Sequence, residues 1–312
     1  MVYYPGAGKW SSVGLDDCSD LVPLQSSDTY RGGRMTSNRK ACIFCGSTTN
    51  KISKEHVFRN ALRKYAPSDL GMMFENFTTG ERRELKDSLF DQTLRKVCKP
   101  CNEGWMERLE VQVEPVLAAL IMGEPTSLTQ HEARALARWA AKTNVVRGHT
   151  GRSLAVQPSA AAEIRDCEVL PSDWHVLIWR YAEATTTDLL RHFDTDIYTV
   201  EAHGGNPDTV HHGKAWSQEH ILVLGQVIIY SRFSRQPEHF IDHLEDSWAE
   251  AFEMTCLQQC VLPEIGETVS SAELPMLKVG ELWKLASILP RAFELQTGKR
   301  WDGGGDLYPR QR

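Results

Sequence analysis

Two pairs of cysteines with the same spacing constrain this chain more than any other feature of its sequence. Cys42 and Cys45 form one C-x-x-C pair, and Cys98 and Cys101 form a second. Two tight turns of this kind offer four thiolates to one tetrahedral zinc ion. The alternatives are buried reduced cysteines and two disulfides, although a disulfide across C-x-x-C is usually a redox motif at a strand-to-helix turn, which neither pair resembles. The spacing therefore predicts a structural zinc site that holds two distant turns together.

The remaining composition is that of an ordinary globular protein. The chain has 312 residues, of which 41% are apolar and 24% charged, so it can form one large domain or two smaller ones around a real core. The other four cysteines are too sparse for a disulfide scaffold. No stretch approaches the roughly 18 consecutive apolar residues of a membrane span, and the N-terminus lacks the order of a secretory signal. We therefore expect a cytoplasmic protein with no membrane attachment.

Charge is distributed unevenly along the chain. Between Met35 and Asn102 there are 13 Lys and Arg against 7 Asp and Glu, whereas the remainder carries 22 against 34. A basic block inside an acidic chain is typical of a localised polyanion-binding site, and it is equally typical of a solvated charged face. Composition alone does not separate these two interpretations.

The pattern of apolar residues predicts an α+β protein in which a small zinc module precedes a larger α+β domain of unknown type. Residues 1–34 lack periodicity and are expected to be a disordered arm, and residues 299–312 a flexible tail. The zinc module spans 35–124 and includes a long helix that starts after Asn102 and ends near Gly123. Thr129 and Glu132 make a capping box that opens a second helix. The larger domain, 125–298, contains predicted strands at 174–182, 196–201 and 220–232, a polar loop at 204–214, and helices at 238–260 and 280–293.

A chemically active set of residues lies beside the cysteine pairs. Glu55 and His56 are adjacent in a short predicted strand, and Asn102 directly follows the fourth cysteine. If zinc joins the two turns, the strand and the start of the helix become neighbours. Phosphodiester hydrolysis uses such a set, because an imidazole can deprotonate a water while a divalent cation stabilises the leaving oxygen. The oxygen ligands of Glu55 and Asn102 suit Mg²⁺ or Mn²⁺ rather than zinc.

At these residues the sequence resembles the HNH endonucleases, the zinc-knuckle branch of the ββα-metal nucleases. The family pattern of C-x-x-C, an acidic residue with His, and C-x-x-C followed by His or Asn is found here as Cys42-Ile-Phe-Cys45, Glu55-His56 and Cys98-Lys-Pro-Cys101-Asn102. The resemblance covers residues 41 to about 110. It implies a ββα-metal fold and a metal-dependent endonuclease, with His56 as the general base and Glu55 and Asn102 as ligands of the catalytic Mg²⁺ or Mn²⁺.

The chain departs from the family pattern at two positions. Arg59 stands where the family often has Pro, and Thr93 stands where it usually has its middle Asn. A threonine hydroxyl at 93 can still fix the segment that carries His56, and Asn76 is a second candidate for the missing amide. The 52 residues between Cys45 and Cys98 also exceed what compact family members need.

Nucleic acid, with DNA first, is the expected partner of the module. Four basic residues between the cysteine pairs are candidates for phosphate contacts, although each alone is more typical of surface charge: Lys54, Arg59, Arg63 and Lys64. The alternative hypothesis is a non-catalytic zinc module that binds nucleic acid or a protein partner. The acidic larger domain shows no motif that favours a protein or a ligand as its own partner. His239 and His243 have the spacing of two metal ligands on a helix but lack the metalloprotease signature.

Overall fold

The computed structural model describes residues 41–67, 72–76, 81–85, 88–150, 156, 158–203, 206–235, 241–262, 265–266 and 268–298. Lys40–Arg312 form one compact unit, and Met1–Arg39 are grouped apart from it. The predicted arm at 1–34 and the predicted tail at 299–312 lie outside the described residues. The boundary predicted at residue 124 falls inside the compact unit. Helices and strands alternate along this unit, which confirms the α+β class.

A hairpin and the helix that follows it form a ββα unit beside the cysteines. Strands β1 (Ile52–His56) and β4 (Thr93–Cys98) pair antiparallel, with Ile52 opposite Cys98 and His56 opposite Thr93. The chain then passes through α1 (Lys99–Cys101) and a π-helical turn (Asn102–Met106) into α2 (Glu107–Met122). Gly123 ends α2 in the left-handed conformation, at a φ of 70°, which glycine adopts without a steric penalty. The predicted long helix is confirmed, with its end where the glycine indicates.

The long segment between the cysteine pairs adds two strands to a central sheet. β2 (Met72–Asn76) and β3 (Glu81–Leu85) pair antiparallel, and β2 also pairs parallel with β6 (Trp174–His203). In that pairing Met72 lies opposite Asp188. The segment therefore contributes two strands to the central sheet, whereas the β1–β4 hairpin on either side of it forms a separate two-stranded sheet.

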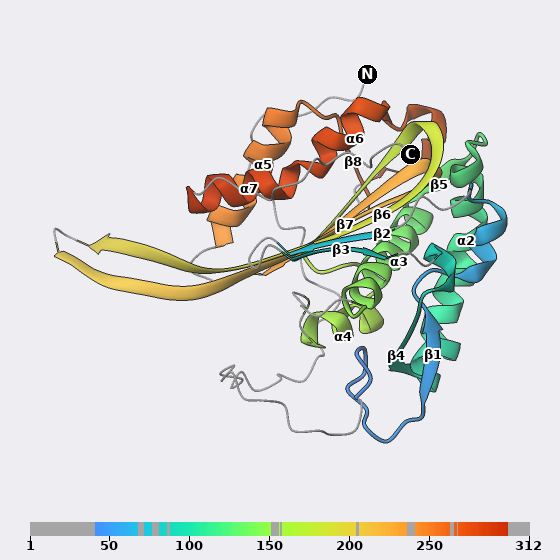
Figure 1. Ribbon diagram of the computed structural model, residues 1–312, viewed down its shortest axis with the longest axis horizontal. Helices are drawn as coiled ribbons and strands as arrows, with labels where there is room; N and C mark the ends of the chain where they lie inside the picture. The colour runs from blue at the N-terminus through green and yellow to red at the C-terminus, as the bar shows by residue number, and fades with distance from the viewer. Residues whose placement is uncertain are drawn as a thin grey trace. The chain divides into compact units, whose positions relative to one another are not determined.

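Two long antiparallel strands dominate the central sheet. β6 pairs with β7 (Asn206–Arg235) from Trp174 opposite Phe233 to His203 opposite Asn206. Beyond the helices the two strands continue as a hairpin (Figure 1). The prediction of a polar loop at 204–214 was wrong, because β7 begins at Asn206. Its residues are polar and show no apolar alternation, so only the backbone pairing with β6 makes them a strand, and pairing between distant residues leaves little local signal.

Helices cover both faces of the sheet (Figure 1). On one face α2, α3 (Gln130–Gly148) and α4 (Pro158–Asp166) pack on Ile178, Leu222 and Leu224. On the other, α5 (Ile241–Thr255), α6 (Val279–Ala286) and α7 (Ile288–Thr297) pack on Trp179 and Tyr230. Alternate residues of one strand thus serve two cores. The remaining short strands are β5 (Ser127–Thr129), paired with β9 (Thr268–Ser270), and β8 (Cys260–Val261) and β10 (Met276–Leu277), both paired with β6.

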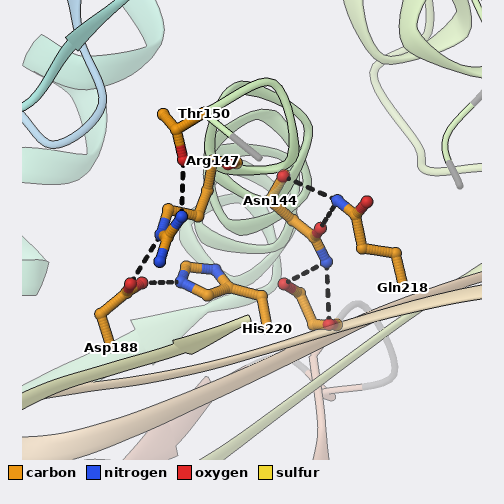
Figure 2. A network of polar contacts seen from close by, with 7 residues as sticks. Asn144, Arg147, Thr150, Asp188, Gln218 and His220 are labelled. Carbon is orange, nitrogen blue, oxygen red and sulfur yellow. Dashed lines mark hydrogen bonds and ion pairs between the residues drawn. The ribbon is translucent and has the colours of Figure 1, made fainter. Parts of the chain in front are cut away.

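A buried polar network fixes the last turns of α3 to the sheet (Figure 2). Asn144 Nδ2 donates to the backbone and hydroxyl oxygens of Ser231, at 2.9 and 3.1 Å. Arg147 Nε donates to one oxygen of Asp188 at 2.6 Å, and the other oxygen lies 2.5 Å from His220 Nε2. Every one of these side chains is buried. The N-terminus of α3 carries the predicted capping box, so both ends of this helix are held.

The network also lowers the pKa of Asp188 and contacts the segment that follows β1. Burial alone would raise the pKa of Asp188, but Arg147 and His220 outweigh it and hold that pKa below its usual value. The ring of His220 lies 6.0 Å, centroid to centroid, from the ring of Phe58, which follows β1. The network therefore joins α3, the central sheet and the segment that follows β1.

His192 is a buried imidazole on β6, the strand that also carries Asp188. Its burial predicts that the protein loses stability in mild acid. The side chain is 4% exposed, and among the described residues its Nδ1 has no hydrogen-bond partner. Burial lowers the pKa of His192 to about 4. Because the unfolded chain binds this proton near pH 6.5 and the folded chain only near pH 4, stability is complete above pH 6.5 and falls as the pH drops toward 4. We expect this group alone to remove about 3 kcal/mol over that window.

Urea unfolding at pH 7, 5.5 and 4.5 measures this effect. In His192→Gln the stability should fall less steeply with acid than in the wild type, because the group that titrates is absent. His131→Gln is the matched control, since the side chain of His131 is 68% exposed. A His192→Gln profile parallel to that of the wild type would contradict the assignment.

Candidate functional site

The four cysteines that the sequence pairs are brought together into one cluster. The sulfur atoms of Cys42, Cys45, Cys98 and Cys101 all lie within 4.8 Å of one another, and all four are free thiols. Zinc–thiolate bonds of about 2.3 Å in a tetrahedron space the sulfur atoms about 3.8 Å apart. The sulfur atoms of Cys45 and Cys98 are 3.5 Å apart. The cluster therefore has the donors and the spacing to hold a structural metal such as zinc.

Backbone geometry builds the cluster. Gly46, at a φ of 66°, turns the chain after the first pair, and its N–H donates to the carbonyl of Cys42 at 2.9 Å. The backbone N–H of Cys98 donates to the sulfur of Cys42 at 3.3 Å. Burial opposes ionisation of Cys42, but N–H donors from Cys98 and two neighbouring residues lower its pKa to about 7. Burial raises the pKa of Cys101, to which the nearby charge of Cys42 adds. A zinc ion supplies the positive charge that lets four such thiols ionise together.

Aromatic packing connects the cluster to the helices. The rings of Phe44 and Trp105 meet edge to face with centroids 5.1 Å apart, and the guanidinium of Arg138 lies 5.3 Å from the Trp105 ring. Met106 is buried in the same core. Trp105 and Met106 therefore pack the helical segment on the cysteine cluster.

Glu55 and Asn102 meet on the inner side of the β1–β4 hairpin. Glu55 is 5% exposed and forms a side-chain hydrogen bond with Asn102. The amide nitrogen of Asn102 also donates to the hydroxyl of Ser53 at 3.0 Å, and that hydroxyl donates to the carbonyl of Val97 at 3.0 Å. Burial raises the pKa of Glu55 to about 7, and the positive charge of Lys142 and the Asn102 hydrogen bond only partly oppose this. The structure thus brings together the two residues that sequence reasoning proposed as ligands.

A lysine from α3 lies at the same place. The ammonium of Lys142 is fully buried and lies 2.7 Å from a carboxylate oxygen of Glu110 on α2. The charges of Lys142 and Glu110 both act on Glu55. The oxygens of Glu55 and Asn102 suit Mg²⁺ or Mn²⁺ by type, but a positive charge is already supplied there by the protein. In this arrangement the residues do not fit a divalent cation. Sequence reasoning missed Lys142, whose one signal is a lysine between the apolar stretches 139–141 and 145–146 of a helix.

His56 lies on the opposite, outer side of the hairpin. Its side chain is exposed, as expected where neighbouring residues of a strand point to opposite faces. Thr93 pairs directly with His56 across the hairpin, which places this threonine where it can support the strand that carries His56. The imidazole of His56 is open to solvent, whereas the carboxylate of Glu55 is not.

The outer side of the hairpin concentrates positive charge. The pairing shifts between Ser53 and Glu55, so that Lys54 faces both Arg95 and Lys96. These three side chains are exposed, and within the described part of the chain none of them forms an ion pair. We call His56, Lys54, Arg95 and Lys96 the basic face. Like charges directly opposite each other repel, so an anionic partner would stabilise this surface. Sequence reasoning missed Arg95 and Lys96.

The other predicted phosphate contacts have partners within the protein. Arg59 lies 3.1 Å from Glu114 and 3.8 Å from Glu110. Lys64 lies 3.7 Å from Glu114, and Arg63 lies 2.5 Å from Asp91. These carboxylates neutralise the positive charges that would otherwise be available to bind a phosphate. Among the four predicted contacts, Lys54 is the one on the basic face.

The remaining sequence candidates do not join the site. Asn76 lies on β2, which pairs with β3 and β6 rather than with the β1–β4 hairpin. His239 lies outside the described residues, and the side chain of His243 is not described. Over the described residues the cysteine cluster is the one group of metal-binding side chains that the structure brings together. None of the helices that the structure describes combines the length and the apolar character needed to cross a membrane.

Comparison with known proteins adds no relative: no protein-family model, no curated protein and no solved structure matches this chain.

Proposed function

We propose that this protein is an endonuclease of HNH type that hydrolyses phosphodiester bonds in nucleic acid, with DNA as the first substrate to test. The observation that carries the proposal is the exposed imidazole of His56 beside Lys54, Arg95 and Lys96, on a hairpin braced by a four-cysteine cluster and followed by a helix. An exposed imidazole set among cations is suited to act on a bound phosphate.

The chemistry follows from these groups. The cations of the basic face bind the phosphate oxygens and offset the negative charge that grows on them during attack. His56 removes a proton from a water molecule, and the hydroxide oxygen forms a bond to phosphorus. The bond from phosphorus to one sugar oxygen breaks, and that oxygen takes a proton from solvent. Catalytic Mg²⁺ or Mn²⁺ on Glu55 and Asn102 remains part of the proposal only if Lys142 leaves these residues.

A second function is favoured by a specific observation. Glu55 is buried and lies near the ammonium of Lys142, whereas the basic face is open. A zinc module with this arrangement can bind nucleic acid through the basic face without cutting it. Contacts between cations and phosphates give an affinity that depends neither on the base sequence nor on any cleavage reaction. Binding without cleavage is therefore the alternative to the endonuclease.

Nicking of supercoiled plasmid tests the proposal. Wild type, His56→Ala and His131→Ala, checked for equal zinc content, are incubated at low salt with Mg²⁺, with Mn²⁺ or with EDTA. We expect nicking by the wild type that falls at least about 100-fold in His56→Ala, the range typical of a lost general base. His131→Ala, which removes an exposed histidine elsewhere, should cut like the wild type.

Binding of the same plasmid separates the two functions. If the wild type binds DNA without nicking under any condition, and if Lys54→Gln with Arg95→Gln weakens that binding, the protein is a binding module. Nicking that His56→Ala leaves unchanged would remove His56 from the chemistry.

A further inference from the structure

Lys142 occupies an unusual position for a lysine. Its side chain is fully buried in α3, and its ammonium lies 2.7 Å from Glu110 Oε1 and 5.9 Å from the centroid of the Trp139 ring. Burying an ammonium costs several kcal/mol unless close partners compensate for the lost water. The close partner here is the carboxylate of Glu110, and the charge of Lys142 also reaches the buried carboxylate of Glu55.

The groups around Lys142 come from one strand and the helical part of the ββα unit. Glu110 on α2 pairs with it, Glu55 on β1 lies within reach of its charge, and Asn102 at the start of the helical segment is hydrogen-bonded to Glu55. All three side chains carry oxygen atoms, the donors that Mg²⁺ and Mn²⁺ prefer. Arg59, 3.8 Å from Glu110, is the second cation that reaches this group. The buried ammonium thus pairs with one oxygen donor of the kind found in divalent-cation sites, and its charge acts on a second.

Lys142 is held in place from outside the ββα unit. Two and five residues further along α3, Asn144 and Arg147 are bonded to β7 and β6 of the central sheet (Figure 2). At 100° per residue these positions lie on a different side of the helix from Lys142. The sheet therefore fixes the helix that brings Lys142 to Glu55 and Glu110.

We propose that Lys142 is a tethered cation that competes with divalent cations for Glu55 and Glu110, and that it keeps this site closed to metal while α3 is docked on the sheet. The conclusion that this competition regulates a nuclease rests on the proposed function. The competition between Lys142 and a divalent cation does not. Removing the lysine charge should open a site for one Mn²⁺ ion, formed by Glu55, Glu110 and Asn102.

Binding of Mn²⁺ to the full-length, zinc-loaded protein tests the competition. Loss of the free-ion signal in electron paramagnetic resonance counts the Mn²⁺ bound by the wild type, Lys142→Met and Lys142→Arg. We expect Lys142→Met to bind one additional Mn²⁺ at least about tenfold more tightly than the wild type, while Lys142→Arg, which keeps the charge, stays weak. Adding Glu55→Gln to Lys142→Met should abolish the gain.

A second uncharged variant and an Mn²⁺ rescue keep the test decisive if a Lys142 variant fails to fold. Lys142→Gln removes the charge but keeps a donor for Glu110, so it serves as a second uncharged variant. If either variant loses its fold, Mn²⁺ must restore it, since the ion supplies the missing charge. No gain in Mn²⁺ binding by folded variants, no rescue of unfolded ones, or a gain that survives Glu55→Gln would each overturn the proposal. Nicking is not measured here, so the failure of the nuclease and the failure of the competition are separate results.

Discussion

Replacing Cys98 by serine is expected to abolish zinc binding and to destabilise the whole compact unit, with a loss of at least about 5 kcal/mol. Structural zinc sites contribute folding free energy directly, and apparent values of about 10 to 16 kcal/mol are typical for small zinc modules. Cys98 lies at the end of β4, directly before the helical segment, and is fully buried. Without the metal, the turn at Cys42 and the start of the helix lose their link.

The loss should extend beyond the cysteines because the core is continuous. Val97, Leu117, Trp139 and Leu224 belong to the same hydrophobic cluster as Cys98, although they come from β4, α2, α3 and β7. Disorder around the cysteines would therefore expose apolar surface on α2 and α3 as well. A single cooperative transition at lower temperature is the expected form of the loss, rather than separate melting of a small module.

Zinc content by mass spectrometry and thermal unfolding by circular dichroism measure both consequences. Cys256→Ser is the matched control, because Cys256 is exposed and lies outside the cluster. It should keep one zinc per chain and the melting temperature of the wild type. A Cys98→Ser protein that melts like the wild type would show that the cluster does not stabilise the fold through a metal.

Local patterns were sufficient for the features that depend on nearby residues. The capping box at Thr129 and the glycine at 123 define helix ends through contacts within one turn, so the sequence indicates them directly. The cysteine spacing likewise predicts a shared site, because four thiolates have few uses other than a metal. Glu55 and Asn102 were expected to meet for the same reason, and the structure brings them into hydrogen-bonding contact.

The features that depend on distant pairing were not predictable in this way. Lys142 is 87 positions from Glu55 in the chain, and nothing near it indicates that the charge of an α3 lysine acts on a β1 carboxylate. The basic face requires the register of β1 on β4, since the shift after Ser53 places Lys54 across from Arg95 and Lys96. The ion pairs of Arg59 likewise require the position of α2. In each case the missing information was which strand or helix packs on which.

Asp188→Ala is expected to cost about 3 to 5 kcal/mol at pH 7, because it removes the buried carboxylate that lies 2.6 Å from the guanidinium of Arg147 and breaks a buried ion pair. The folded-state pKa of Asp188 is lowered, so its contribution is complete above about pH 4 and is lost only as the pH falls through that lower value. Urea unfolding at pH 7 measures the cost. The control is Asp166→Ala, which breaks a partly exposed pair with Arg165 and should change stability by less than about 1 kcal/mol. If the two substitutions cost the same, the buried network does not fix α3 to the sheet. If Asp188→Ala costs the larger amount and also raises the affinity for Mn²⁺, the docking of α3 is what keeps Lys142 paired with Glu110 and its charge within reach of Glu55.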